Sequence, residues 1–451
     1  MVVGREPTRA ELYRIIEALR AENAELRAAN VRLTARIEEL EAEVAALRGV
    51  GGASGSGPVR PSRPARPPRK VGPRRKRPHA FVRPRGIATR QVEHVVAACP
   101  DCGCALRGGS VKRHREVIEI APTPATITDH RIVERVCPVC RKRCVPRLGA
   151  EDGVVGQHRF GPRLLAEIVT LHQVGRMTVR TIQEYLTTMF GVHVSLGAVE
   201  NALRTVAAYG QTEVAAIRDR VRASPVVHAD ETSWPEDGSW RTLWVVSTPT
   251  DRYFEIGRRT SARIDAILGA DFAGVLVTDF YAAYHHFGLH QRCWAHILRA
   301  LHDLCAAYPD DRALGRWSRR LCHISASARA GPIGATPGDR RRLRHLLEQR
   351  LHAACLPVAT RDVPHRRLAA RLVKFLSQLF TFVTDPTVAS TNNQAERDLR
   401  PSVIARKISG GTRSPHGSET IASLATLYRT WRARGLNPFH QCLALLVSPQ
   451  P

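Results

Sequence analysis

The sequence has no run of 18 or more apolar residues, so it predicts no transmembrane helix. The N-terminal segment also lacks the apolar core of a secretory signal peptide, and we therefore expect a cytoplasmic protein. Acidic residues are few beside basic ones, 41 against 68, which gives a formal net charge of +27. Such a charge concentrates polyanions, so the composition favours nucleic acid over a membrane as the partner and predicts association with the nucleoid.

A heptad pattern occupies the N-terminal segment, where leucine recurs at every seventh position from Leu12 to Leu47. The positions four residues after these leucines are mostly β-branched or asparagine, including Asn23 and Asn30. This pattern is typical of a parallel two-stranded coiled coil. We predict a leucine zipper over residues 8–48 that pairs the chain with a second copy of itself. The alternative is a single amphipathic helix packed on its own domain.

The next segment, residues 49–88, is rich in glycine, proline and arginine, and its stretch 49–85 has no acidic residue. A segment of this composition cannot bury a hydrophobic core, so we predict a disordered basic linker. Its basic clusters, such as PRRKR, suit contact with phosphate backbones. A solvated spacer without any such contact is an equally good interpretation.

Two C-x-x-C pairs, within CPDCG and CPVCRKRC, lie in residues 89–150 and are separated by strand-like stretches. Four thiolates form the closed shell that a structural Zn²⁺ prefers, so the pattern predicts a zinc ribbon, with redox-active pairs as the alternative. The spacing between the pairs is longer than the commonest zinc spacing. The predicted zinc ligands are Cys99, Cys102, Cys137 and Cys140. Cys104 and Cys144 are spare candidates.

Residues 155–222 are helical by pattern. Within them one predicted helix breaks at Gly191, and Ser195 is placed to cap a second helix. Two helices joined in this way have the shape of a helix-turn-helix, which predicts a DNA-binding region. Many helical pairs look the same without touching DNA, so plain helix packing stays open as the alternative.

From residue 223 the pattern changes to three neighbouring strands, a short helix and another apolar strand. This is the order of a ribonuclease-H-like α/β core, in which the first and fourth strands lie side by side. One apolar stretch ends at Asp230 and another at Asp279. The two carboxylates would then lie close together. Either residue alone could be an ordinary turn or cap residue.

Two adjacent carboxylates repel each other unless a cation lies between them, and Mg²⁺ (or Mn²⁺) binds oxygen ligands of this kind. The stretch TNNQAERDLR predicts a helix capped by Thr391 or Asn392 and limited or kinked at Pro401. Asn392, Glu396 and Arg400 share one face of that helix because they are spaced four residues apart. Glu396 is therefore the predicted third metal ligand, with Glu419 as the next candidate.

The order of the zipper, the zinc ribbon, HADET, VTDFYAAY, CWAH, NNQAERDLR and ISGGTRSPHGSE resembles the insertion sequence 66 family of transposases. The resemblance implies a catalytic triad of Asp230, Asp279 and Glu396 that uses Mg²⁺ to cut and join DNA. It also implies that small accessory proteins act beside the transposase. Cys293 and His296 match the CWAH turn and would either brace the active site or only pack.

The predicted fold is multidomain α+β: a coiled coil, a zinc ribbon, a helix-turn-helix-like helical region and a ribonuclease-H-like catalytic domain over residues 223–435. That domain carries a helical insertion at about 305–388, with a break at ARAGPIGATPGD, and residues 436–451 form a C-terminal tail. The predicted function is binding of terminal inverted repeats followed by cleavage and strand transfer. The alternatives are a non-catalytic zinc-dependent DNA-binding regulator and a nuclease without strand transfer. The candidate DNA contacts are Arg397, Arg400, Arg406 and Lys407.

Overall fold

The structure is a computed structural model that describes residues 90–108, 110, 111, 117, 125–269, 271–331 and 336–448, with Glu17, Ala28 and Glu39. Apart from these three positions, the predicted zipper and linker lie outside the described residues. The chain divides into two units, Met1–Ile118 and Glu119–Pro451, which are described separately. In the part of the chain that is described, no helix is both long and apolar enough to cross a membrane.

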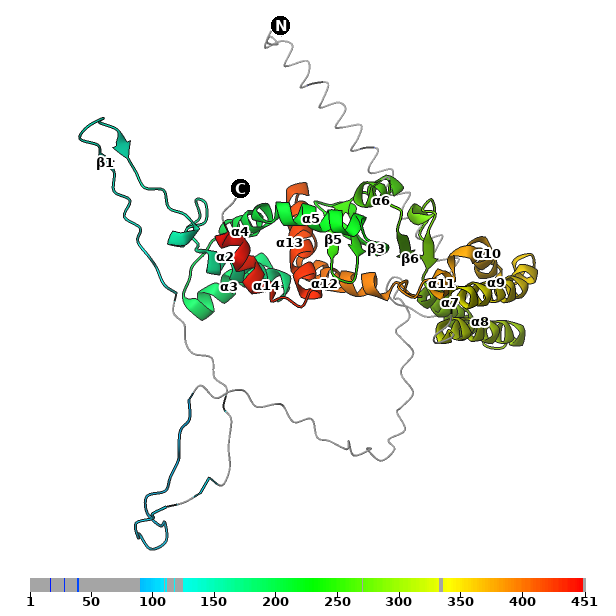
Figure 1. Ribbon diagram of the computed structural model, residues 1–451, viewed down its shortest axis with the longest axis horizontal. Coiled ribbons are helices and arrows are strands. Elements are labelled where there is room, and N and C mark those ends of the chain that lie inside the picture. Colours follow the sequence, from blue (N-terminus) through cyan, green and yellow to red (C-terminus); the bar gives the residue numbers. More distant parts are fainter. Residues whose placement is uncertain are drawn as a thin grey trace. The chain divides into compact units, whose positions relative to one another are not determined.

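A five-stranded mixed sheet forms the centre of the second unit, in the order β5-β4-β3-β6-β7 (Figure 1). Its strands are β3 (Val226–Glu236), β4 (Ser239–Ser247), β5 (Arg252–Gly257), β6 (Val275–Thr278) and β7 (His290–Arg292). Strands β3, β4 and β5 pair antiparallel, whereas β6 pairs parallel with both β3 and β7. The prediction that the first and fourth strands lie side by side is confirmed by the pairing of β3 with β6.

The prediction that the first strand ends at Asp230 is wrong. Strand β3 continues to Glu236, which pairs with Ser239 on β4. Asp237 and Gly238 both have positive φ, which is the two-residue turn that joins antiparallel strands without splaying them. Only the parallel pairing with β6 stops early, at His228. Asp230 thus lies on a continuous strand, just beyond the point where its parallel neighbour ends.

The two faces of the sheet are covered by different layers, as the alternation along β4 shows. Leu243 and Val245 pack in one cluster with Ala395 and Leu399 of helix α12 (Asn393–Ser409). Trp244 and Val246 alternate with these two residues along β4. They lie on the opposite face of the sheet and belong to a larger hydrophobic cluster there. That second cluster includes side chains of helix α6 (Ser261–Leu268) and of the 3₁₀ turn η2 (Ala282–Tyr284).

The helices before the sheet share this larger cluster with it, together with two helices from the end of the chain (Figure 1). These helices are α2 (Pro162–Gln173), α3 (Val179–Phe190), α4 (Leu196–Tyr209), α5 (Gln211–Arg222), α13 (Pro415–Ala433) and α14 (Pro438–Val447). The predicted break and cap are confirmed, because Gly191 ends α3 in the left-handed region and the Ser195 side chain accepts from Ala198 N. Helix α14, in the segment expected as a tail, buries Cys442 and Leu446 in the cluster.

Between β7 and α12 the chain forms a set of helices with a hydrophobic cluster of their own. These helices are gathered beyond β6 in Figure 1. Its elements are α7 (Trp294–Ala307), α8 (Arg312–Ala330), α9 (Pro337–Ala359), α10 (Arg366–Lys374), η3 (Leu376–Gln378) and α11 (Thr381–Thr384). The predicted break falls between α8 and α9. Trp294 and Ile297 belong to this cluster, so the insertion's packing begins earlier than about residue 305.

Helix α12 corrects two expectations about the stretch TNNQAERDLR. It continues past Pro401 to Ser409, and Arg406 ties this far part of the helix to Thr232 and Ser233 of β3. Asn392 stands at the N-cap position but its side chain makes no capping bond. That side chain is bonded instead to the neighbouring strand, as described below.

Outside these elements, the turn η1 (Ala150–Asp152) precedes α2, and a short hairpin joins β1 (Arg135–Val136) to β2 (Arg143–Cys144).

Candidate active site

The two predicted aspartates lie on adjacent parallel strands. Asp230 lies on β3 and Asp279 follows the last residue of β6. The Asp279 carboxylate accepts a hydrogen bond from the backbone N–H of Tyr281 at 2.8 Å. Its backbone oxygen accepts another from Nη1 of Arg292 at 2.8 Å. These bonds fix the turn after β6, so the carboxylate stays at the end of the strand.

Arg292 itself is fully buried on β7, beside the mutually packed aromatic rings of Phe280 and Phe375. Burial lowers the pKa of Arg292 to about 10, and the nearby charge of Asp279 acts in the opposite direction. Its Nε donates to Gln378 at 2.9 Å, which ties β7 to the helical insertion. Arg292 was not among the residues predicted for the site, although a charged residue directly before the CWAH motif is a usable signal.

Glu396 comes to the same region from α12 through a joint centred on Asn392. The Asn392 side chain is fully buried; its Nδ2 donates to Ala229 O at 2.7 Å, and its Oδ1 lies 3.3 Å from His228 Nδ1. Both contacts are on β3, immediately before Asp230. Glu396 N donates to Asn392 O at 3.2 Å, so the carboxylate is carried one helical turn beyond the joint.

The Asp230 carboxyl shows how these groups come together. Burial is the main cause that raises the pKa of Asp230 to about 8, and the charge of Glu231 adds to it. Asp279 and Glu396 raise it further, which means that both lie near enough to repel a charge on Asp230. Asp279 and Glu396 are therefore within electrostatic reach of Asp230, while Arg292 and Arg259 are within reach of Asp279.

Glu231 follows Asp230 directly but belongs to the other face of the sheet, because side chains alternate along a strand. There its carboxylate accepts from Tyr284 Oη at 2.6 Å and from Arg259 Nη2 at 2.8 Å. Burial raises the pKa of Glu231, and these two hydrogen bonds oppose that effect. Glu231 is thus already partnered, whereas Asp230 faces α12. This difference explains why the first acidic residue of HADET is the candidate ligand.

The CWAH turn lies against Glu396. Cys293 is buried and its Sγ accepts from the backbone N–H of Asn392 at 3.1 Å, while His296 Nδ1 lies 3.7 Å from Glu396 Oε1. Backbone bonds tie this turn to both neighbours: Cys293 N donates to Thr278 O at 2.8 Å and Trp294 N donates to Ser390 O at 3.0 Å. The CWAH turn is therefore bonded to the segment around Asn392 from which α12 starts. Such bracing is one of the two roles expected for the motif.

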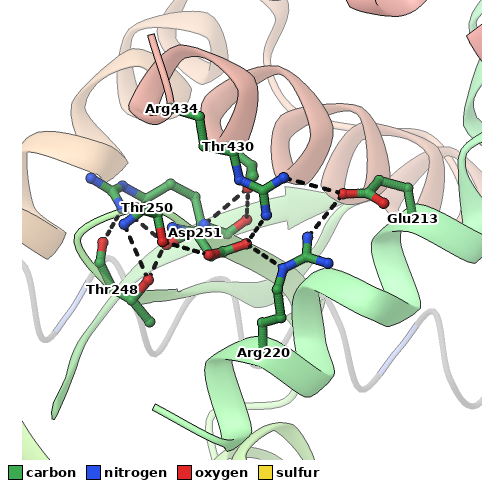
Figure 2. A network of polar contacts seen from close by, with 8 residues as sticks. Glu213, Arg220, Thr248, Thr250, Asp251, Thr430 and Arg434 are labelled. Carbon is green, nitrogen blue, oxygen red and sulfur yellow. Dashed lines mark hydrogen bonds and ion pairs between the residues drawn. The ribbon is translucent and has the colours of Figure 1, made fainter. Parts of the chain in front are cut away.

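A polar network joins α5 and the end of α13 to the segment that leads into β5 (Figure 2). Asp251, which is 4% exposed, accepts from Arg220 Nε at 2.9 Å and from Arg434 Nη2 at 2.5 Å. Next to it, Arg252 forms an ion pair with Asp398 of α12, and Ser247 Oγ donates to the same carboxylate at 2.8 Å. Asp398 lies two residues after Glu396, so this anchor also fixes the rotation of α12.

The four predicted DNA contacts differ in their surroundings. Arg397, Arg400 and Lys407 are exposed on α12. Arg406 is half-buried, and its Nη1 donates to the Ser233 backbone oxygen on β3 and, at 3.2 Å, to Thr232 Oγ1. Arg406 thus connects the far end of α12 to the strand that carries Asp230.

The first C-x-x-C pair forms a tight turn in the first unit. Gly103 N donates to Cys99 O at 2.9 Å, and Cys99 N donates to Cys104 O at 2.9 Å. Gly103 has a φ of 75°, a conformation that glycine adopts without strain. The N–H groups of Cys102 and Asp101 lower the pKa of Cys99, which favours the thiolate that a metal requires.

The second pair repeats this turn in the second unit. Arg141 N donates to Cys137 O at 3.0 Å, Cys137 N donates to Lys142 O at 2.9 Å, and Arg141 has a φ of 58°. The N–H groups of Cys140 and Val139 lower the pKa of Cys137. Each pair by itself thus has the same hydrogen-bonded form. Because the pairs belong to different units, a shared zinc site remains a prediction.

Comparison with known proteins identifies the family. The profile described as "Transposase IS66 family" matches residues 157–420. The chain belongs to this transposase family.

Curated relatives of this transposase come from Sinorhizobium fredii (strain NBRC 101917 / NGR234). The uncharacterized protein y4qI is 26% identical over 260 residues, which cover 49% of this chain and 47% of that protein. The uncharacterized protein y4jO is 28% identical over 194 residues, covering 41% of this chain and 56% of that protein. The chain spans about half the length of the curated relatives it matches. The family match contains all three candidate carboxylates, whereas both C-x-x-C turns lie before it.

Proposed function

We propose that this transposase binds the terminal inverted repeats of its own element, cleaves the DNA there and joins the freed 3′ ends to target DNA. The observation that supports the proposal is that Asp230 on β3 and Asp279 after the adjacent parallel strand β6 are within electrostatic reach of each other, and that Glu396 of α12 also acts on Asp230. The strand order and the covering of one sheet face by α12 support a ribonuclease-H-like core for this chemistry.

These three carboxylates, the carboxylate cluster, fit a divalent cation. Oε1 of Glu396 is buried without a hydrogen-bond partner among the described residues, and the charges of Asp279 and Glu396 both disfavour a charge on Asp230. Three carboxylates offer the oxygen ligands that Mg²⁺ or Mn²⁺ takes. When bound, such a cation supplies activation of the attacking oxygen and stabilisation of the leaving oxygen in phosphodiester chemistry. The protein's own part is to hold the carboxylates in place, through Asn392 on one side and Arg292 on the other.

DNA binding follows from charge and exposure. Arg397 and Arg400 are exposed on the helix that carries Glu396, where they suit contact with phosphates next to the site. Helices α3 and α4, joined at Gly191 and capped by Ser195, support a role as a helix-turn-helix reader of the repeat. The zinc ribbon, the basic linker, dimerisation through the zipper and the accessory proteins belong to the same proposal and rest on the sequence.

The decisive experiment incubates the purified protein with labelled end DNA, target DNA and Mg²⁺, and separates cleaved from joined products. We expect both products from the wild type. Glu396→Gln removes the charge that holds a hard cation, so it should reduce both by roughly a thousandfold or more, because several kcal/mol of transition-state stabilisation are lost. Its binding to end DNA should be unchanged.

Glu419→Gln is the matched control, because Glu419 is an exposed glutamate at the start of the next helix. It should cleave and join like the wild type. Cleavage without joining would favour the nuclease alternative, and binding without cleavage would favour the regulator. Normal cleavage by Glu396→Gln would remove this residue from the site.

A further inference from the structure

A second group of ligand atoms lies beside the carboxylate cluster and includes a sulfur and a nitrogen. Within the described residues, Cys293, His296 and Glu396 form a group whose ligand atoms all lie within 4.8 Å of one another. The bracing role of the CWAH turn explains why Cys293 is buried. It does not explain why a sulfur, an imidazole nitrogen and a carboxylate oxygen converge on one point.

The sulfur of Cys293 is surrounded by donors. It lies at the N-terminus of α7, where the backbone N–H groups of Asn392, His296 and Ala295 are directed at it. A thiol with its own proton would need an acceptor, and no hydrogen bond donated by Cys293 is found among the described residues. Burial raises the pKa of the Cys293 thiol and these backbone donors oppose that effect, so the thiol gives up its proton when a metal binds.

The other two atoms face each other without a hydrogen bond. His296 Nδ1 and Glu396 Oε1 are buried atoms without a hydrogen bond in the described structure, and they lie 3.7 Å apart. Buried polar atoms are nearly always bonded, so two such neighbours indicate a ligand between them. Both atoms are acceptors when the imidazole carries its proton on Nε2, so they cannot bond each other but can share a cation.

We propose that Cys293, His296 and Glu396 bind a second type of cation, Zn²⁺ or a similarly thiophilic divalent metal, with a fourth position open. Thiolate, imidazole and carboxylate are the three ligand types of zinc in proteins, and three protein ligands with one open position form a zinc site that is not closed. Mg²⁺ does not suit this group, since it takes oxygen ligands almost alone. The site is separate from the predicted ribbon, whose cysteines lie elsewhere in the sequence.

The site shares Glu396 with the carboxylate cluster, and this consequence rests on the proposed function. A carboxylate held by zinc through Oε1 is less available to a hard cation beside Asp230. Zinc should therefore oppose the Mg²⁺-dependent reaction, and the sensitivity to zinc should depend on Cys293, which has no part in the Mg²⁺ site.

The test measures metal binding first. Full-length protein is dialysed against Zn²⁺ and the bound metal per chain is determined, for the wild type, Cys293→Ser and His296→Ala. Both variants should hold one equivalent less than the wild type, whatever the ribbon retains. Cys355→Ser is the control, because Cys355 is equally buried but lies in the helical insertion away from the group. With Co²⁺ as the probe, the thiolate-to-cobalt absorption should decrease in Cys293→Ser and not in Cys355→Ser.

Inhibition of end-DNA cleavage by zinc supplies the second measurement, with each protein compared with its own zinc-free rate. The zinc concentration for half-inhibition should rise on the order of tenfold or more in both site variants, as loss of a metal-site contact implies. Equal zinc content in the wild type, Cys293→Ser and His296→Ala would overturn the site. His296→Ala replaces a side chain that is about one third exposed, so it tests the site if Cys293→Ser misfolds. If the wild type fails to cleave while the zinc content still differs, the proposed function fails and the metal site stands.

Discussion

Removal of the Asn392 side chain should weaken the joint on which the carboxylate cluster depends. The change Asn392→Ala deletes the bond to Ala229 O and the contact with His228 Nδ1, both at a position with no exposed surface. The substitution changes only the side chain, so the backbone N–H of residue 392 can still donate its hydrogen bond to Cys293 Sγ. The variant therefore tests the link between α12 and β3, and leaves the link to the CWAH turn.

The expected loss of stability depends on the buried polar groups that lose a hydrogen-bond partner. Loss of a partner that leaves a buried polar group unsatisfied costs about 1–3 kcal/mol. His228 Nδ1 is such a group, since burial is the main cause that lowers the pKa of His228 to about 4 and the ring stays neutral at pH 7. Ala229 O has a second lone pair for its strand partner, so its loss is smaller, about 0.5–1.5 kcal/mol. We expect the free energy of unfolding of this unit to fall by about 1.5–4.5 kcal/mol, the sum of these terms.

Urea denaturation followed by tryptophan fluorescence measures this difference, provided that the dependence on urea is the same in both proteins. The control is Asn393→Ala, the exposed neighbour at the first helical position, which should change stability by less than about 0.5 kcal/mol. End-DNA cleavage should fall in Asn392→Ala and not in Asn393→Ala. Equal stability and equal cleavage in the two variants would refute the view that Asn392 positions α12.

Three further outcomes are expected. The pKa of Asp230 is raised from 3.8 to about 8, mainly by burial, so the metal-free protein should lose stability as the pH rises from about 4 to about 8. Thermal denaturation with and without Mg²⁺ should show that the cation restores this stability most near pH 8. Burial would raise the pKa of Asp251, but bonds from Thr250, Arg220 and Arg434 outweigh it and lower it. Asp251→Asn should therefore lower the free energy of unfolding by about 1.5–3 kcal/mol at pH 7. The difference from the wild type should disappear as the pH falls through the lowered pKa of Asp251. Affinity for end DNA should fall steeply with salt, and a value that is flat between low and moderate salt would contradict phosphate contacts by the basic residues.

The parts of the fold that the sequence predicted correctly depend on local chemistry. Gly191 ends a helix because it adopts a positive φ without strain, and Ser195 starts one because its hydroxyl accepts a backbone N–H. The adjacency of β3 and β6 follows from the order of apolar stretches, and its confirmation supports the choice of Asp230 and Asp279. The helix end and the helix cap can be read within a few residues, and the strand adjacency can be read from the order of the predicted elements.

The predictions that were wrong concern positions where contacts with another strand or helix determine the structure. Strand β3 passes Asp230 since β4 pairs with it up to Glu236, and α12 passes Pro401 since the sheet holds it. The bonds of Asn392 to β3 take its side chain away from the capping role that its position suggests. The burial of Arg292 escaped prediction because its partners lie on the helical insertion.

The helical insertion does not need to disturb the carboxylate cluster, because its two ends are bonded to each other. The chain enters the insertion at Trp294 and leaves it at Ser390, and Trp294 N donates to Ser390 O at 3.0 Å. Among the described residues its main hydrophobic cluster contains no side chain of the sheet or of α12, and its contact with Val226 and Val277 of the sheet is made near its C-terminal end, by Phe382 and Val388. Asn392 then begins α12, and Glu396 follows at the spacing that keeps both on one helical face. The position of Glu396 is thus set by the joint at the start of α12. We infer that changes inside the insertion can alter its size or surface without moving the third carboxylate, as long as the contacts of Trp294, Ser390 and Asn392 persist.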